Sequence, residues 1–331
     1  MTDAGFPSLL QRFFTDRLLN QLGASPHTVA SYRDVFCLLL RFAEDQFGRS
    51  PSELRLKDLD VSFIRRFIDH LEHGRKNCPR TRNNRLSALQ SFFRYVTFCE
   101  PELILHCQRI LAIPAKRYER APVAFLTKEE TASLVAAPDA KTWIGRRDRA
   151  LLILALQTGL RNSEITSLRC QDVEFGRGAH IRCVGKGRKM RCTPLRQDVI
   201  SVLKEWLLER KGNLIDPVFP SLRGTRLSAD ALQGIVARHA ATARLSCPSL
   251  TEKKVTPHTL RHTAAMDLLQ RGVDLTVIAL WLGHESTETT EIYLHADMRL
   301  KEQALANANA SGVTPERYRP SDPLLTFLEG L

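Results

Sequence analysis

Apolar side chains recur at helical spacing through the first third of the chain. Ser25 followed by Pro26 is typical of a helix start, because serine caps free backbone N–H groups and proline fits the first helical turn. Asp58 or Asp60 opens another helix, in which apolar positions at i, i+3, i+4 and i+7 share one face. A further helix begins near Thr81. The pattern predicts a compact unit of four helices within residues 9–22, 26–42, 58–71 and 81–96.

The rest of the chain combines helical patterns with one strand-like segment. Thr127 and Glu130 match a capping box, in which the two residues bind each other's free backbone N–H groups at a helix start. Residues 179–195 alternate as two strand-like runs around the glycine-rich sequence GKGRK, which predicts a β-hairpin. Further helices are expected at residues 198–209, 229–239 and from 257 onward.

Residues 112–124, AIPAKRYERAPVA, have no helical periodicity and contain two prolines and three basic side chains. This composition is typical of a linker. A chain of 331 residues also suits two domains better than one. We therefore predict a mainly α fold with a small β-hairpin (α+β), with one domain in residues 1–111 and a second in residues 125–331.

The charge of the chain favours a polyanionic partner. It has 48 Lys and Arg against 36 Asp and Glu, a formal net charge of +12 and a pI near 9.6. Residues 1–120 hold 19 basic and 13 acidic side chains, which leaves 29 and 23 for the remainder and an excess of +6 in each part. Two basic domains can bind one nucleic acid together, and a membrane with acidic lipids is the alternative.

No stretch of the sequence approaches the roughly 18–20 consecutive apolar residues that span a bilayer, and no apolar run of signal-peptide length follows the N-terminus. We therefore expect a cytoplasmic protein with no membrane partner. Eight cysteines are present, and none forms a C-x-x-C pair. This distribution fits neither a zinc site nor a disulfide framework, so free and mostly buried thiols are expected.

One predicted helix places two kinds of basic side chain on a single face. In TPHTLRHTAAMDLL, residues 256–269, His258 is followed by Arg261 and His262 at i+3 and i+4. A His-x-x-x-His pair is also a zinc-binding pattern, but Thr259 stands where the zinc-peptidase signature has Glu. No metal and no cofactor is expected, since no carboxylate cluster or nucleotide-binding glycine motif accompanies these residues.

Charged residues also follow the most apolar segment of the chain. Arg161 and Glu164 in TGLRNSE come directly after the run RALLILALQ, although a charge is costly to bury. Four further motifs follow in order: GKGRK with Lys186, HTLRH, LGH with His284 and TTEIYLH with Tyr293. At this order and spacing, the set resembles the active site of the tyrosine recombinase (phage integrase) family, and in particular a simple Xer-type or transposon-borne recombinase.

The resemblance implies that Arg161 and Arg261 bind the scissile DNA phosphate while Tyr293 attacks it. A 3′-phosphotyrosyl link forms, a 5′-hydroxyl leaves, and no water is used, so the bond energy is kept for rejoining. The phenol has an ordinary pKa of about 10, so it needs a proton acceptor near neutral pH. His258 suits that role, because the ordinary pKa of histidine is about 6.5. Lys186 is the expected general acid for the leaving oxygen.

The remaining predicted site residues support this chemistry. Lys189 is the alternative general acid if Lys186 does not act in catalysis. His284 donates a hydrogen bond to the phosphate. Glu164 either orients a basic group of the site or forms an ordinary helix salt bridge, and His262 is assigned to packing. Five basic residues of the first domain and the linker either contact DNA phosphates or form a solvated face: Arg80, Arg82, Arg85, Lys116 and Arg117.

The resemblance further implies a helical core-binding domain, a basic linker, a catalytic domain and a homotetramer on double-stranded DNA, in which related recombinase subunits can take part. Residues 298–310 form a helical pattern that docks either onto a neighbouring subunit or onto its own domain. Integration, excision, transposition and resolution are all open as roles.

Two alternatives remain. A type IB topoisomerase shares the tyrosine chemistry. A non-catalytic DNA-binding regulator is the other alternative, because residues 264–283 look like a helix-turn-helix. The second helix of that pattern is too apolar to read bases, however, and is expected to lie in the core.

Binding to DNA is expected to weaken steeply with salt, because each phosphate that Lys or Arg neutralises releases counterions. If six or more phosphates are contacted, the affinity for a duplex should fall about 1,000-fold or more between ~50 and ~200 mM salt. Fluorescence anisotropy of a labelled duplex measures this. An affinity that does not change with salt would contradict a basic DNA-binding surface.

Overall fold

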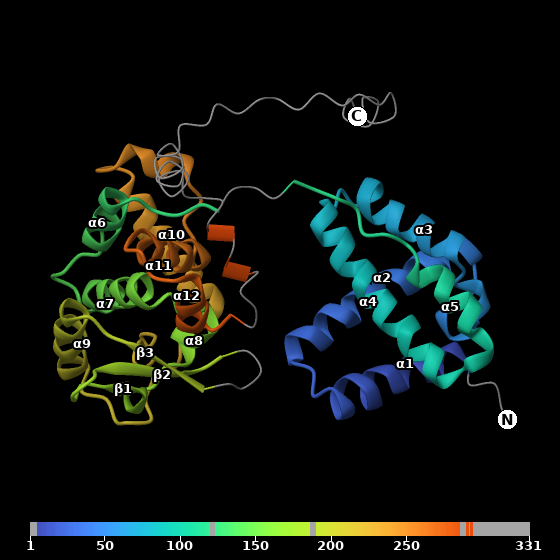
Figure 1. The fold of residues 1–331 in the computed structure, drawn as a ribbon, viewed down its shortest axis with the longest axis horizontal. Coiled ribbons are helices and arrows are strands. Elements are labelled where there is room, and N and C mark those ends of the chain that lie inside the picture. Colours follow the sequence, from blue (N-terminus) through green and yellow to red (C-terminus); the bar gives the residue numbers. More distant parts are fainter. Residues whose placement is uncertain (1–4, 120–122, 186–189, 285–288, 291, 294–331) are drawn as a thin grey trace, which may run out of the picture. The chain divides into compact units, whose positions relative to one another are not determined.

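Two compact units make up the described part of the chain (Figure 1). The structure is a computed structural model that describes residues 5–119, 123–185, 190–284, 289–290 and 292–293. Its contacts divide the chain into unit 1, Met1–Arg120, and unit 2, Ala121–Leu331. Within the described ranges, no helix has both the length and the apolar composition that crossing a bilayer requires.

Unit 1 contains helices and no strand in its described residues. Ser25 accepts a hydrogen bond from the Thr28 backbone N–H at 3.2 Å, and Asp60 accepts one from Phe63 at 2.7 Å, so both are helix caps. The four expected helices are confirmed, and a fifth follows that the pattern did not predict. The bounds are α1 (Phe6–Arg12), the π-helical η1 (Phe13–Gln21), α2 (Pro26–Phe47), η2 (Pro51–Glu53), η3 (Leu56–Asp58), α3 (Val61–Asp69), η4 (His70–Gly74), α4 (Pro79–Cys99), η5 (Pro101–Leu103) and α5 (Ile104–Leu111).

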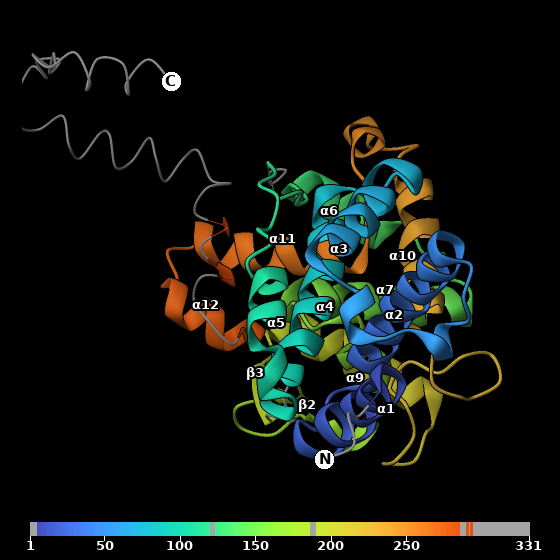
Figure 2. The same cartoon turned by 90° about the vertical axis from the view of Figure 1, so that its right-hand side faces the viewer.

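Phe92 lies at the centre of the unit 1 core. Its ring contacts those of Phe6, Phe13, Phe36 and Phe93 at centroid distances between 5.3 and 6.0 Å. All five rings are buried. This cluster joins α4 to α1, η1 and α2, and α5 also packs against α4 (Figure 2).

The first part of the expected linker is bound to α4. The Asn83 side chain donates to the Lys116 carbonyl at 2.8 Å and accepts from the Lys116 backbone N–H at 2.9 Å. Arg82 donates to the Pro114 carbonyl at 3.2 Å. Residues 114–116 therefore extend the fold of unit 1, and the domain bounds drawn from the sequence stay a prediction.

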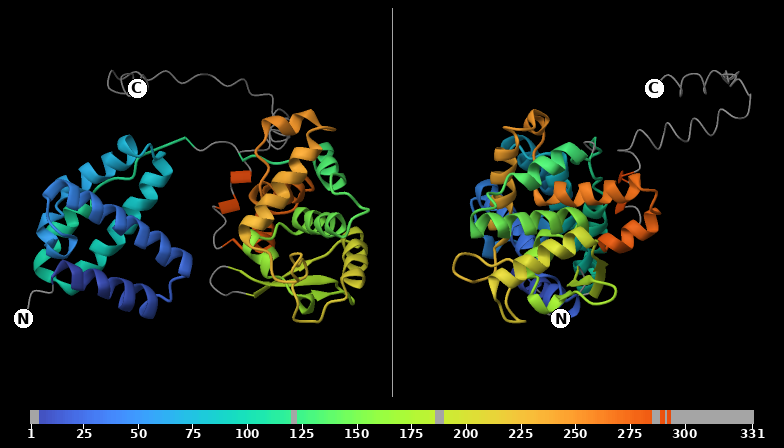
Figure 3. Two further views of the ribbon diagram at one scale, coloured as in Figure 1. Left: turned by 180° about the vertical axis from the view of Figure 1, so that it is seen from behind. Right: turned by 90° about the vertical axis from the view of Figure 1, so that its left-hand side faces the viewer.

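Unit 2 joins helices to a small antiparallel sheet in the order β1-β2-β3. Strands β2 and β3 form the expected hairpin, with Cys183 opposite Arg191, whereas β1 is too short to give an alternating pattern and was not expected. The sheet lies beside α7 and α9 (Figures 1 and 3). Thr127 and Glu130 form the expected capping box of α6. The bounds are α6 (Lys128–Ala136), α7 (Trp143–Thr158), α8 (Asn162–Ser167), η6 (Cys170–Asp172), β1 (Val173–Glu174), β2 (His180–Val184), β3 (Met190–Pro194), α9 (Gln197–Arg210), α10 (Ala229–Ala243), η8 (Pro248–Glu252), α11 (Pro257–Gln270) and α12 (Leu275–Leu282).

α7 contains charged side chains that are buried in the core of unit 2. Asp148 is fully buried, accepts hydrogen bonds from Arg147, and shares one with Nε2 of His239 on α10 at 2.8 Å. Arg147 also donates to the Pro220 carbonyl at 2.8 Å. These bonds satisfy the buried charges and join α7 to α10.

The expectation that the second helix of the helix-turn-helix pattern lies in the core is only half right. In this helix, α12, Ile278 and Leu282 are buried, but Leu280 is 71% exposed and Val277 is 48% exposed. α12 has apolar residues on every side, so composition could not tell which face packs against α11.

The cysteines are free, as expected, but the expectation that most are buried is wrong. Among the eight, Cys107 and Cys183 are buried, while Cys37, Cys78 and Cys192 are exposed. Position on a helix or strand decides the exposure of such a small side chain, and residue type alone does not.

Replacing Phe92 with alanine removes a ring that four others contact. We expect unit 1 to lose about 3–5 kcal/mol of unfolding free energy. Phe98→Ala is the matched control, because Phe98 lies on the same helix and is 76% exposed. Its loss should stay within about 0.5 kcal/mol. Urea unfolding followed by circular dichroism measures both variants, and equal losses would contradict the assigned core.

Candidate active site

Two helix C-termini meet at the site. α7 ends at Thr158 with Gly159 as its cap at φ 62°, and α12 ends at Leu282 with Gly283 as its cap at φ 66°. Both glycines have the left-handed conformation that favours glycine. A Cβ at Gly159 would lie 2.6 Å from Leu282 Cδ2, so the two helix ends pack directly together. The last carbonyls of each helix carry partial negative charge, which favours cations here.

Arg261 of α11 binds both helix ends. Its Nη1 donates to the Gly159 carbonyl at 2.7 Å, and its Nη2 donates to the Leu282 carbonyl at 2.8 Å. The residue is only 4% exposed. Burial, together with the charge of Arg161, lowers the pKa of Arg261 to about 10. The guanidinium therefore stays charged near pH 7.

Arg161 stands at the start of α8 and reaches the end of α12. Its Nη2 donates to the Gly283 carbonyl at 2.7 Å, next to the carbonyl that Arg261 binds. Its Nη1 donates to Glu164 Oε1 at 3.0 Å, and its backbone N–H donates to Oε2 at 2.7 Å. The structure thus brings together the two arginines that the sequence pairs, and it explains the charge after the apolar run: carbonyls and a carboxylate compensate it.

Glu164 is buried, at 3% exposure, and binds a second arginine. Arg191 Nη1 donates to Oε1 at 2.8 Å, and Arg191 Nη2 donates to Oε2 at 2.9 Å. Burial raises the pKa of the Glu164 carboxyl, but the hydrogen bonds from Arg191 and Arg161 and their positive charges outweigh it. The net pKa lies below its usual range, so Glu164 is an anion between two cations.

Sequence reasoning missed Arg191. On β3, Thr193 is fully buried, while Met190 and Cys192 are exposed. Side chains two apart on a strand share a face, so the buried Thr193 places Arg191 on the inner face. The position of an arginine on the inward face of the predicted hairpin was the signal that could have identified Arg191.

His284 directly follows the cap of α12. Its backbone N–H donates to the Ala279 carbonyl at 2.9 Å, and its Nδ1 shares a hydrogen bond with the Thr290 hydroxyl at 2.8 Å. Burial lowers the pKa of His284 to about 4, with smaller contributions from Arg261, Arg161 and Arg191. The imidazole is therefore neutral near pH 7.

Tyr293 is 1% exposed and bound to a histidine that the sequence assigned to packing. The Tyr293 hydroxyl lies 3.0 Å from His262 Nδ1, so the role of His262 includes a hydrogen bond as well as ring packing. Burial raises the pKa of Tyr293 to about 12 and lowers that of His262 to about 4. His258 is exposed one turn earlier on α11, and its ring stacks 6.3 Å from that of His262.

Lys186 and Lys189 lie outside the described residues, but the strands that flank them reach the site. A Cβ at Gly185 would lie 3.1 Å from Arg191 Nη1, 3.4 Å from Glu164 Oε1 and 3.7 Å from Arg161 Nη1. Gly185, which directly follows β2, therefore lies beside the arginine cluster. The tail at residues 298–310 also lies outside the described residues.

The five basic residues predicted to contact DNA differ in their surroundings. Arg80 and Arg117 are exposed. Arg85 is partly buried, which lowers the pKa of its guanidinium. Arg82 donates to the Pro114 carbonyl, and Lys116 forms an ion pair with Glu72. Arg82 and Lys116 therefore have structural roles within unit 1, whatever else they bind.

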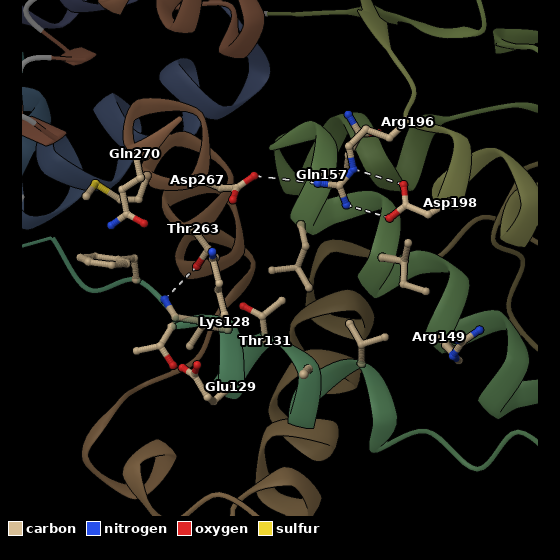
Figure 4. Close-up of a pocket in the computed structure, with 18 of the residues that line it drawn as sticks. Lys128, Glu129, Thr131, Arg149, Gln157, Arg196, Asp198, Thr263, Asp267 and Gln270 are labelled. Atoms are coloured by element: carbon tan, nitrogen blue, oxygen red, sulfur yellow. Dashed lines mark hydrogen bonds and ion pairs between the residues drawn. The ribbon is translucent and has the colours of Figure 1, made fainter. Parts of the chain in front are cut away.

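A cavity of about 820 Å³ lies elsewhere in unit 2 (Figure 4). Thr263, Asp267 and Gln270 of α11 face it, and Arg196 binds Asp198 at its rim at 2.9 Å. Among the predicted catalytic residues that the structure describes, none lines this cavity. It is separate from the arginine cluster.

Family models match both parts of the chain. Residues 124–299 match the phage integrase family, and residues 10–97 match the phage integrase N-terminal SAM-like domain. The chain belongs to the phage integrase family. It is a tyrosine-type site-specific recombinase, as the sequence motifs indicated.

Relatives of this recombinase align over most of its length. It is 51% identical over 328 residues to an integrase/recombinase of Sinorhizobium fredii, y4rC, which covers 99% of both chains. It is 32% identical over 283 residues to tyrosine recombinase XerC of Pelotomaculum thermopropionicum, which covers 82% of this chain and 88% of XerC. The crystal structure of XerH site-specific recombinase in a post-cleavage complex with palindromic difH substrate has a TM-score of 0.69 and 26% identity, and covers 86% of this chain and 80% of XerH.

The fold of unit 2 should lose stability in mild acid. His262 and His284 have folded pKa values of about 4, below the ordinary value of about 6.5. The unfolded chain binds more protons between these values, so the contribution to stability is complete above about pH 6.5 and is lost as the pH falls toward 4. The unfolding free energy should fall by about 1–2 kcal/mol per histidine between pH 7 and 5.

Urea unfolding at several pH values measures how steeply the unfolding free energy falls with falling pH. His262→Gln should reduce this slope by removing one titrating group, while His73→Gln, a change at an exposed histidine of unit 1, should leave it unchanged. A stability of unit 2 that is constant from pH 7 to 5 would contradict the buried, neutral histidines.

Proposed function

We propose that this recombinase cleaves and rejoins DNA strands through a covalent link between Tyr293 and a 3′-phosphate. The observation that carries this proposal is the pair of guanidinium groups bound to adjoining carbonyls at the end of α12. Each guanidinium has five N–H donors, and two in Arg161 and two in Arg261 are used in the bonds described above. The remaining donors suit the non-bridging oxygens of a phosphodiester, which gain charge during attack.

Tyr293 is the proposed nucleophile. Its burial and its raised pKa of about 12 mean that the described arrangement holds a protonated phenol out of solvent. Attack therefore requires the hydroxyl to leave its bond with His262 and approach the arginines, whose charge favours the phenolate. His258, which is exposed beside His262, is the proposed proton acceptor.

His284 is the proposed hydrogen-bond donor to the phosphate. When the Thr290 hydroxyl donates to Nδ1, the ring proton lies on Nε2, and this neutral tautomer can donate to a phosphate oxygen. Lys186 is the proposed general acid for the leaving 5′-oxygen, with Lys189 as its substitute. The position of Gly185 beside the arginine cluster supports a lysine at the next residue in that role.

Double-stranded DNA is the proposed partner, and a homotetramer on two sites is the proposed assembly. XerH is bound to its difH substrate in the solved structure that this chain resembles. The basic charge of both units and the exposed Arg80 and Arg117 support phosphate contacts in unit 1, with Arg82, Arg85 and Lys116 as further contacts. The segment at residues 298–310 is proposed to dock onto a neighbouring subunit. Integration, transposition and resolution all use this chemistry.

Tyr293→Phe should keep DNA binding and lose the covalent adduct, because phenylalanine has no nucleophilic oxygen. The measurement is a nicked suicide substrate, on which the wild-type protein is trapped and migrates as a protein–DNA complex in a denaturing gel. The variant should bind the same duplex with an affinity within about threefold, since one hydroxyl adds little to a charge-dominated interface. An adduct formed by Tyr293→Phe would refute the assignment. Relaxation of supercoiled plasmid without exchange between two sites would favour the topoisomerase alternative.

A further inference from the structure

Arg191 lies at the junction of three parts of the proposed site. Its two terminal nitrogens bind Glu164, at 2.8 and 2.9 Å. A Cβ at Gly283 would lie 2.6 Å from Arg191 Nη1, and one at Gly185 would lie 3.1 Å from the same atom. The guanidinium therefore touches the root of the hairpin, the start of α8 and the turn before His284.

One carboxylate is shared by two arginines in an unequal way. Arg191 takes both oxygens of Glu164, whereas the side chain of Arg161 reaches Oε1 alone, at 3.0 Å, and turns its Nη2 to the Gly283 carbonyl. A guanidinium and a carboxylate prefer a bidentate pair. Arg191 occupies the geometry that Arg161 would otherwise adopt.

The surroundings of Arg191 do not favour a role in stability alone. Its Nε is buried and has no hydrogen-bond partner within the described ranges of the chain. A buried ion pair is also weak evidence for stability, because removing two charges from water offsets most of their attraction. The free-energy cost of burying this ion pair is explained if the pair positions groups for the reaction.

We infer that Arg191 is a positioning residue for strand cleavage, because it occupies Glu164 and thereby keeps the Arg161 guanidinium available to the scissile phosphate. The inference rests on the proposed function. Arg191 touches no reacting atom itself and acts through Arg161. Without it, Glu164 competes with the phosphate for Arg161.

The test compares single-turnover cleavage of a suicide substrate at saturating DNA, with DNA affinity and thermal unfolding measured for every protein. Arg191→Met should reduce the cleavage rate about 100-fold and change the affinity by less than about threefold. Arg191→Lys keeps the charge but cannot bind both oxygens as a planar fork, so its rate should fall between that of wild type and Arg191→Met. Arg182→Met is the matched control, since Arg182 lies on the neighbouring strand with an exposed side chain that pairs with Glu174, and it should cleave at the wild-type rate.

Two double variants separate positioning from folding. Arg191→Met/Glu164→Gln removes the carboxylate that would capture Arg161, so it should cleave at least tenfold faster than Arg191→Met. In the background of Arg161→Ala, adding Arg191→Met should not slow cleavage further, because the side chain through which Arg191 acts is already gone.

Three outcomes would overturn the inference: wild-type cleavage by folded Arg191→Met, no rescue by Glu164→Gln, or a full additional loss in the Arg161→Ala background. If Arg191→Met does not fold, the cleavage rates of Arg191→Met/Glu164→Gln and Arg191→Lys still test the inference. Failure of the wild-type protein to form any adduct would instead refute the proposed function, so the two failures are distinguishable.

Discussion

The site depends on the binding of positively charged side chains to the carbonyls at two helix ends. Arg161 and Arg261 lie against the carbonyls that end α7 and α12, where the helix dipoles favour cations. The two guanidinium groups repel each other: burial lowers the pKa of Arg261, and the charge of Arg161 lowers it further. With Arg191 the cluster has three guanidinium groups, and two of them, those of Arg161 and Arg191, pair with the carboxylate of Glu164. The cluster keeps an excess of positive charge that a phosphodiester anion would neutralise.

Three titratable groups around this cluster are uncharged near pH 7. His262 and His284 have pKa values of about 4, and Tyr293 has one of about 12, because all three are buried. Within the described residues of the site, the charged groups are thus the three arginines and Glu164, while Tyr293, His262 and His284 are neutral near pH 7. Tyr293, the proposed nucleophile, is buried and its hydroxyl is bonded to His262.

Much of the fold could be predicted because its signals are local. Helix caps such as Ser25 and Asp60 and the alternation of the hairpin depend on a few neighbouring residues, and the structure has them where expected. The two-residue β1 is too short for a period to emerge.

The candidate site divides in the same way. Motif order indicated the family, but the partners of Arg191 and His262 are 27 and 31 residues away along the chain. Such contacts depend on how distant elements pack. Helical spacing placed His258 and His262 on one face, yet it could not say which of them meets Tyr293.

The turn at Gly283 has an evolutionary consequence. Its φ of 66° disfavours any other residue, and a Cβ there would lie 2.6 Å from Arg191 Nη1. A mutation of this glycine therefore faces two separate obstacles, of which only the second is relieved by a shorter side chain at position 191. Changes at the two positions should therefore be linked in one direction. A lineage that has lost Arg191 still retains Gly283, because the backbone conformation there favours glycine. A lineage that lost Gly283 first would have both a strained backbone and a clash with the Arg191 side chain.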